Sequence, residues 1–247
     1  IYCVYKFDRE LRNIMLKYIS IIEINIKSYI SNIFSKKYGT YDYLEHKNFN
    51  ITSKSKKDFQ ELINKINLNI ERNIDNYEDI KKCREQYNTI PLWMLSTLMT
   101  FGNIIKFYTY MKIEDKKDIS NILSINYQDL QIFLKMLNII RNISAHNNIL
   151  FNVRLDIKYP IRKTISCYHE KLGILKNKNI YESGINDILS IIIIILKRLL
   201  QHDEYLSFVD EFIRNIDQVK NVLDIESFEN FLKCMSIPIN YDILSLL

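Results

Sequence analysis

The longest periodic stretch of the chain lies near its start and constrains the fold most. Over about residues 7–37, apolar residues recur at intervals of three and four, which is the spacing of one helix face: Phe7, Leu11, Ile14, Tyr18, Ile21 and Ile22. The opposite side mixes charged with aliphatic residues: Arg12, Leu16, Ile19, Glu23 and Lys27. We therefore expect one long helix that contacts protein on both faces and ends at Gly39.

Glycine and proline, which interrupt helices, are scarce in the rest of the chain as well. Only four Gly and three Pro occur among 247 residues, so long helices are favoured over a sandwich or barrel of many strands. A hydrophobic fraction of 47% and a charged fraction of 26% are typical of a soluble globular chain with a sizeable core. The prediction is an all-α fold, with further helices at about residues 58–73, 91–111, 127–147, 184–200, 204–222 and 227–235.

Some stretches depart from this helical pattern. Gly102 costs a helix about 1 kcal/mol relative to Ala, so we expect a close crossing or a break there. Residues 40–57 and the lysine pair at 116–117 are expected to be loop with solvated charge. Over residues 152–178 the alternation of apolar and polar side chains predicts an extended loop or at most a short hairpin, from Val153, Leu155, Ile157 and Tyr159.

Charge and cysteine usage exclude several classes of protein. A net charge of +5 is compatible with a nucleic-acid partner without requiring one. The four cysteines are widely separated and form no Cys-x-x-Cys pair, so we expect no zinc site, no disulfide scaffold and a reducing cytoplasm. The longest aliphatic block, residues 188–196, is too short for a bilayer, and there is no glycine-rich phosphate loop. We expect a cytoplasmic protein without a membrane span, metal or cofactor.

Residues 141–146 read Arg-Asn-Ile-Ser-Ala-His and combine a permanent cation with an imidazole that exchanges protons near neutral pH. Helical geometry gathers the core face of this segment on one side: Phe133, Met136, Leu137, Ile140 and Ile143. Asn142 and His146 project from nearly the opposite side, and Arg141 lies on the flank between. The side with His146 also has apolar neighbours, so another helix or subunit can pack there: Ile132, Ile139 and Ile149.

Two interpretations of this segment follow from the residues alone. In the first, Arg141 caps helix carbonyls or pairs with an acid, and His146 is a surface residue near a helix end. In the second interpretation, Arg141 and His146 act together on a phosphate group. A spacing of five residues places Arg141 and His146 about 140° apart around a helix, so one copy does not readily converge on one phosphate. Two copies facing each other across a two-fold axis can do so.

Three blocks of sequence together resemble a known family. They are YKFDRELR at residues 5–12 followed by IE at 22–23, PLWM and FG within 91–102, and LNIIRNISAHN at 137–147. The Arg-Asn-x-x-x-His segment resembles the R-x4-6-H motif of the HEPN superfamily. From about residue 5 to 200, the chain resembles the abortive-infection family typified by AbiD and AbiF. The resemblance implies a HEPN-like helical bundle over residues 1–200, with additional C-terminal helices at 201–247 packed on the same domain.

The resemblance also implies a function, namely anti-phage abortive infection by a homodimer that cleaves RNA without a metal. The ribose 2′-OH would attack the adjacent phosphate and leave a cyclic phosphate end. His146 would act as general acid or base, Arg141 would hold the phosphate, and Asn142 would orient one of them. Glu23 would support Arg141, or else pair with Lys27 along its own helix.

One stretch departs from the family pattern. Where members often read RLWNR after the histidine, residues 149–154 read ILFNVR, and Lys27 stands where an arginine is common. Basic residues expected to contact RNA are Arg12, Lys27, Arg154, Lys158, Arg162 and Lys163. The altered stretch and modest charge motivate an alternative, a non-catalytic HEPN module that binds a structured small RNA or the antitoxin RNA of a toxin–antitoxin pair.

Overall fold

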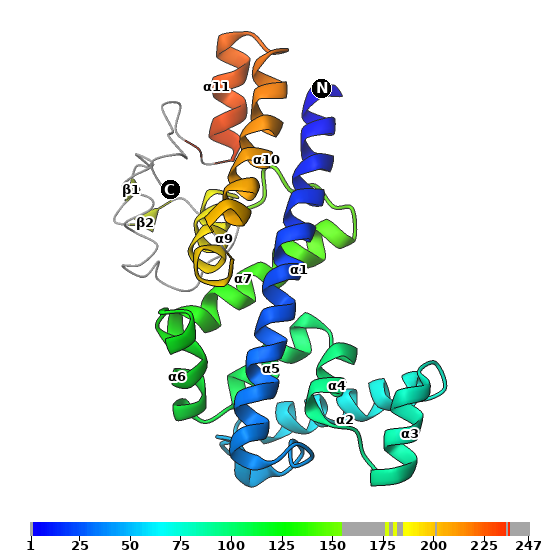
Figure 1. The fold of residues 1–247 in the computed structure, drawn as a ribbon. Coiled ribbons are helices and arrows are strands. Elements are labelled where there is room, and N and C mark those ends of the chain that lie inside the picture. The colour runs from blue at the N-terminus through cyan, green and yellow to red at the C-terminus, as the bar shows by residue number, and fades with distance from the viewer. Residues whose placement is uncertain are drawn as a thin grey trace. The chain divides into compact units, whose positions relative to one another are not determined.

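The computed structural model describes residues 2–154, 176–177, 180–181, 185–200, 202–235 and 237 (Figure 1). These residues are helical except for loops and one antiparallel hairpin of β1 (Lys176–Asn177) and β2 (Ile180–Tyr181), so the predicted all-α class is confirmed. The chain divides into two compact units, one of Ile1–Ile22 with Met136–Leu247 and one of Glu23–Lys135. Helices α1 (Tyr2–Tyr38) and α7 (Tyr127–Ala145) contribute residues to both units.

Helix α1 is the long helix that the periodic stretch predicts. Its apolar stripe is buried except for Ile21, which is half-buried, and Met15 and Ile19 are buried at other positions around the helix, which confirms that it contacts protein on more than one face. The helix ends where expected. The Gly39 N–H donates to the Ser35 carbonyl at 3.0 Å, and a φ of 100° places Gly39 in the left-handed region that glycine adopts without strain.

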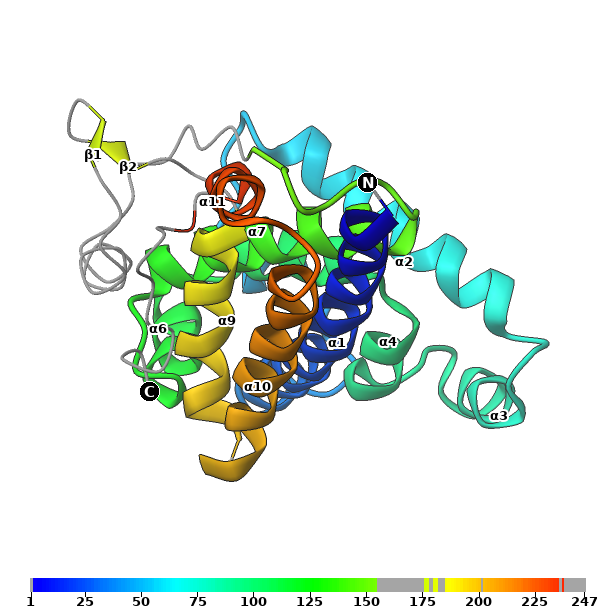
Figure 2. The ribbon, with the colours of Figure 1, turned by 90° about the horizontal axis from the view of Figure 1, so that it is seen from above.

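In the first unit, three C-terminal helices accompany the start of α1: α9 (Ile185–Leu199), α10 (His202–Lys220) and α11 (Ile225–Cys234). Figures 1 and 2 show α10 lying alongside both α9 and the N-terminal part of α1. The Phe7 ring meets Phe231 edge-on at 4.8 Å, and Tyr18 meets Phe208 at 4.9 Å. The sequence pattern predicted all three helices. A domain boundary at residue 200 stays a prediction, and the compact unit includes helices from both sides of that position.

The second unit contains five shorter helices: α2 (Lys56–Asn73), α3 (Glu78–Tyr87), α4 (Leu92–Leu98), α5 (Phe101–Tyr110) and α6 (Ile113–Ile122). A short 3-10 helix, η1 (His46–Asn48), lies in the loop between α1 and α2. The core of this unit contains an aromatic cluster. The centroid of the Phe49 ring lies 4.8 Å from that of Phe59, 5.1 Å from that of Phe107 and 5.2 Å from that of Phe34.

The single helix expected over residues 91–111 is two helices, and the break precedes Gly102. Met99 and Thr100 are extended, and the Thr100 hydroxyl accepts the Asn103 N–H at 3.2 Å as an N-cap. Pro91 is also extended, with ψ at 149°, so it precedes the first helical residue of α4. The chain therefore turns at a capping threonine before it reaches the glycine.

The expectation of solvated loop charge at residues 116–117 is wrong for Lys116. This lysine lies buried in α6, its Nζ donates to the Thr109 carbonyl at 2.5 Å, and burial lowers the pKa of its ammonium group. Its neighbour Asp115 is fully buried and accepts from Lys37 at 2.5 Å and from the Tyr38 hydroxyl at 2.9 Å. The sequence pattern missed α6 because these charges occupy positions where a helix usually buries apolar side chains.

Two other expectations concern the segment after α7 and the membrane. Val153 lies in irregular structure, and the other members of the alternating pattern, Leu155, Ile157 and Tyr159, lie outside the described residues. Among the helices that the structure describes, none combines the length and apolar character needed to cross a bilayer.

Candidate active site

Helix α7 presents its two sides largely as the sequence predicts. Phe133, Met136, Leu137 and Ile140 are buried on the core face, while Ile143, also predicted there, is half-buried. On the other side Asn142 and His146 are exposed, and Arg141 on the flank is half-buried. Ile139 and Ile149 are 48% and 66% exposed, so apolar side chains accompany the exposed polar ones. This end of α7 therefore offers a cation, an amide and an imidazole at a surface that is partly apolar.

A Schellman motif ends α7 and fixes the backbone at His146. The Asn148 N–H donates to the Ile143 carbonyl at 3.1 Å, and the Asn147 N–H donates to the Ser144 carbonyl at 3.3 Å. Asn147 adopts the left-handed conformation that this motif requires, with φ at 56°. His146 is the C-cap residue, and its N–H still donates to the Asn142 carbonyl at 3.1 Å. The imidazole thus leaves the chain from a well-defined helix end.

The loop after this cap is held by Asp8 and Arg12 of α1, which are 5% and 7% exposed. One Asp8 carboxylate oxygen accepts the backbone N–H groups of Leu150 and Phe151, each at 2.8 Å. The other oxygen pairs with the Arg12 guanidinium, which also donates to the Asn148 carbonyl at 3.4 Å. Both buried charges are therefore paired and hydrogen-bonded, as buried ions must be.

Asp8 is a positioning residue that the sequence reasoning missed. A signal was present, because Asp8 lies four residues before Arg12 within the block YKFDRELR, at the spacing of an ion pair along a helix. Arg12 was expected to contact RNA. In the structure its guanidinium contacts Asp8 and the Asn148 carbonyl, and an RNA contact stays a prediction.

Phe151 lies in the stretch 149–154, where the sequence departs from the pattern of the family that it resembles, and it has a structural role. Its ring is half-buried and stacks on Phe231 of α11, with centroids 6.2 Å apart and planes inclined by 15°. Because its N–H is also bound by Asp8, Phe151 ties the loop to both α1 and α11. The stretch that departs from the family pattern after the histidine therefore contains a residue, Phe151, that packs against another helix of the protein.

The remaining predicted residues fall into two groups. In the second unit, the Lys27 ammonium pairs with the Glu23 carboxylate at 2.8 Å along α1. This pair is one of the two alternatives expected for Glu23. A contact between Glu23 and Arg141 stays a prediction. Arg154 is exposed, while Lys158, Arg162 and Lys163 lie outside the described residues. Within the described part of the chain, no group of three or more His, Cys, Asp or Glu is arranged to hold a metal ion.

Fold and site together define an all-α chain in which an arginine and a histidine lie five residues apart at the end of a packed helix, beside a loop held by a buried Asp–Arg pair. A family model described as Abi-like protein matches residues 1–152, more than half of the chain, and the chain belongs to this abortive-infection family. The match includes Asp8, Arg12 and the whole segment from Arg141 to Phe151. Comparisons with curated proteins and with solved structures gave no match.

Proposed function

We propose that this chain is an abortive-infection effector of the HEPN type that cleaves RNA through the Arg141–His146 segment. The observation that carries the proposal is the placement of His146, which is exposed at a Schellman cap whose following loop is fixed by Asp8 and Arg12. A surface histidine of no function does not need a buried ion pair to hold the backbone beside it. A general acid or base does, because its efficiency depends on its geometry.

The chemistry proposed is an attack by the ribose 2′-oxygen on the adjacent phosphorus. His146 removes the 2′-hydroxyl proton, the new O–P bond forms, and the bond from phosphorus to the 5′-oxygen breaks. A second protonated imidazole gives its proton to that leaving oxygen, so that the products are a 2′,3′-cyclic phosphate and a 5′-hydroxyl. Arg141 stabilises the charge on the phosphate oxygens, since its planar guanidinium suits bidentate phosphate binding. Asn142 orients the phosphate or the imidazole.

The second imidazole and the convergence of both groups require a second copy of the chain. Arg141 and His146 diverge around α7 within one copy. A two-fold axis near the end of α7 brings the Arg141 of one protomer to the His146 of the other. The exposed apolar side chains of Ile139 and Ile149 supply a surface for such a contact beside the motif.

The direct test is RNA cleavage by the purified chain in the presence of EDTA. We expect wild type to cut RNA and leave cyclic phosphate ends, and His146→Ala to lose cleavage with little change in melting temperature, because His146 is exposed. Asn13→Ala, another exposed residue of the same unit, is the matched control and should cut as wild type does. Equal cleavage by wild type and His146→Ala would contradict the proposal.

The second candidate is a non-catalytic module that binds a structured small or antitoxin RNA. Phe151 favours it, because the aromatic side chain that follows the motif stacks on Phe231 of α11 and not on a ligand of the site. In that case, one discrete RNA should co-purify with the chain, and growth arrest should persist in His146→Ala. Loss of growth arrest in that variant would favour the nuclease instead.

A further inference from the structure

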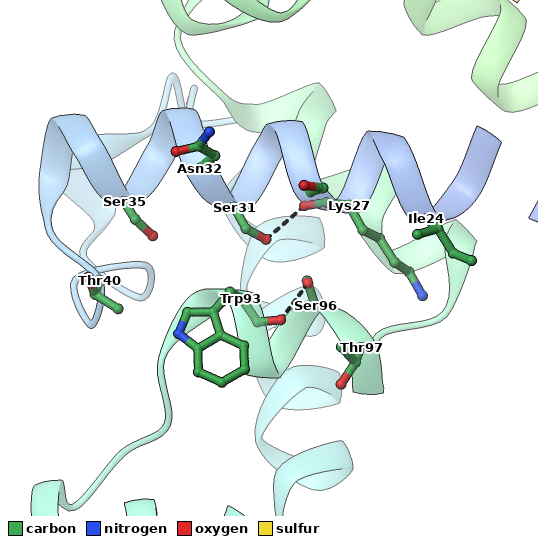
Figure 3. Close-up of a pocket in the computed structure, with 10 residues that line it drawn as sticks. Ile24, Lys27, Ser31, Asn32, Ser35, Thr40, Trp93, Ser96 and Thr97 are labelled. Carbon is green, nitrogen blue, oxygen red and sulfur yellow. Dashed lines mark hydrogen bonds between the residues drawn. The ribbon is translucent and has the colours of Figure 1, made fainter. Parts of the chain in front are cut away.

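A cavity of about 620 Å³ lies in the second unit between the C-terminal part of α1 and helix α4. Its wall combines one aromatic ring, one lysine and several hydroxyls: Ile24, Lys27, Ser28, Ser31, Asn32, Ser35, Thr40, Trp93, Ser96 and Thr97. Figure 3 shows Ser31 of α1 and Ser96 of α4 turned toward one another across the cavity, with Trp93 and Lys27 toward opposite ends. The volume is in the range that takes a small organic ligand.

Trp93 is the aromatic platform of this cavity. Its side chain is 58% exposed, although tryptophan is the largest apolar side chain and the neighbouring residues Leu92 and Leu95 of α4 are buried. An indole face left open beside a cavity with a mainly apolar lining and a few hydroxyls suits stacking by a planar heterocycle, and every nucleobase offers such a face.

The hydroxyls define which hydrogen bonds a ligand must supply. Ser31 and Ser96 are each 4% exposed, and each hydroxyl already donates its one hydrogen to a helix carbonyl, at 2.7 Å to Lys27 and at 2.8 Å to Trp93. Toward the cavity these oxygens can only accept. Ser35 adds a buried hydroxyl that has no hydrogen-bond partner in the described structure. The ligand should therefore carry N–H donors together with a ring nitrogen or carbonyl oxygen.

The charge of the cavity argues against a phosphate as the group held inside. Lys27 is its only lining cation among these residues, and the Glu23 carboxylate lies 2.8 Å from the ammonium nitrogen, so the pair is neutral as a whole. A lysine in such a pair keeps two hydrogens for a ribose or carbonyl oxygen, but it does not provide the uncompensated charge that phosphate binding requires. The favoured occupant is a neutral planar base.

We infer that this cavity is a nucleobase subsite that takes one unpaired, amino-bearing base of RNA, stacked on Trp93 with its amino group on Ser31 and Ser96. The inference rests on the proposed function, since RNA is the substrate or partner proposed for this chain. It adds a place of recognition in the second unit that is separate in sequence from the Arg141–His146 segment. Adenine, which has an amino group and ring-nitrogen acceptors, fits these partners better than uracil, which has two carbonyls and one ring N–H.

Trp93 is the only tryptophan of the chain, so its fluorescence reports on this cavity alone. We would use the His146→Ala variant of the whole 247-residue chain, which is expected to leave RNA intact, and titrate it with oligoadenylate, oligouridylate, adenosine monophosphate and duplex RNA. The expected result is saturable quenching by oligoadenylate, weaker quenching by oligouridylate, and no change with duplex RNA. Ser31→Ala and Ser96→Ala should reduce the preference for adenine over uracil.

Binding of a labelled oligoadenylate, followed by anisotropy, tests the platform itself. Trp93→Leu should weaken binding by about 5- to 150-fold, the range that one base–aromatic stack contributes. Trp93→Phe should restore most of the affinity, and Tyr77→Leu, at an exposed aromatic outside the cavity, should leave it unchanged. Unchanged RNA affinity in Trp93→Leu, or quenching by the free nucleotide without quenching by oligoadenylate, would overturn the subsite. The nuclease proposal would survive either result if wild type still cleaves RNA and His146→Ala does not.

Discussion

At the scale of single residues, Asp8 couples helix α1 to the loop beside His146. Its carboxylate accepts two backbone N–H groups and pairs with the buried Arg12 guanidinium. Removing this charge would leave Arg12 buried without its counter-ion, and breaking a buried pair in this way costs about 3–5 kcal/mol. We therefore expect Asp8→Asn to lower the free energy of unfolding by an amount of this order, measured by urea denaturation.

A matched control for this change lies one residue away. Arg9 pairs with Glu10 at 3.3 Å, but both side chains are largely exposed, and such pairs contribute about 0–1 kcal/mol. Arg9→Ala should therefore unfold at nearly the wild-type urea concentration. If Asp8→Asn behaved as Arg9→Ala does, the loop would not depend on the buried pair. Cleavage activity should fall in Asp8→Asn even where the protein is folded, because the backbone beside His146 is no longer held.

At the scale of elements, we expect the cap of α7 to affect both stability and the proposed RNA cleavage. Asn147 adopts φ at 56°, and a β-branched side chain in the left-handed region costs about 1–2 kcal/mol. Asn147→Val should destabilise the protein by about that amount and lower RNA cleavage through displacement of His146. Asn147→Gly, which adopts the same backbone conformation without strain, should retain both properties. A fully active, fully stable Asn147→Val would show that the cap does not position His146.

Tyr38 and Lys37, at the C-terminal end of α1, should make the free energy of unfolding fall at alkaline pH. Burial and the hydrogen bond to Asp115 raise the pKa of the Tyr38 hydroxyl from 10.0 to about 12. Between these values the folded protein keeps a proton that the unfolded chain has lost, so stability falls as pH rises through this interval. The hydrogen bond to Asp115 raises the pKa of Lys37 as well, which acts in the same direction.

Tyr38→Phe removes the tyrosine contribution to this dependence. We expect the free energy of unfolding to fall less steeply above pH 10 in Tyr38→Phe than in wild type, measured by urea denaturation at a series of pH values. Tyr77→Phe serves as control, because Tyr77 is exposed and is not one of the residues that bind Asp115. An unaltered slope in Tyr38→Phe would rule out Tyr38 as a source of the alkaline dependence.

The same elements show how far sequence reasoning reaches. For helices with a continuous apolar stripe, burial of one face determines the pattern, so the sequence predicts their ends closely. These helices are α1, α2, α7, α9, α10 and α11, and the exception is the start of α1, which lies at Tyr2 and not near residue 7. Helix α3 was missed because Ile80 is its only buried residue, so no stripe exists. Helix α6 was missed because it buries Asp115 and Lys116, whose partners Lys37 and Thr109 come from other parts of the fold.

The candidate site likewise has features that the sequence predicts and features that it does not. The exposure of Asn142 and His146 follows from their angular position on α7 and could be predicted. The contact of Asp8 with Leu150 could not, because it joins residues 142 positions apart and leaves no periodic trace in the sequence. The pairing of Glu23 with Lys27 joins residues four positions apart on α1, so the sequence predicts it as one of two alternatives.

At the scale of the whole molecule, the proposed site is complete only in a dimer. Ile139 and Ile149 flank the motif and are exposed, so a charged side chain there should oppose the approach of a second copy. We expect Ile139→Lys to shift the protein from dimer to monomer in sedimentation and to abolish RNA cleavage. Ile225→Lys, at an 81% exposed isoleucine of α11, should leave both unchanged. A monomeric but active Ile139→Lys would show that one copy suffices.

The most direct test of RNA cleavage by this chain is to sequence the RNA that co-purifies with it and to determine the chemistry of its ends. Wild type and His146→Ala should be expressed at matched levels and isolated in the presence of EDTA. We predict that RNA from wild type ends in 2′,3′-cyclic phosphates at recurrent positions, and that RNA from His146→Ala is uncut at those positions. The same RNAs with the same ends from both proteins would contradict cleavage by His146.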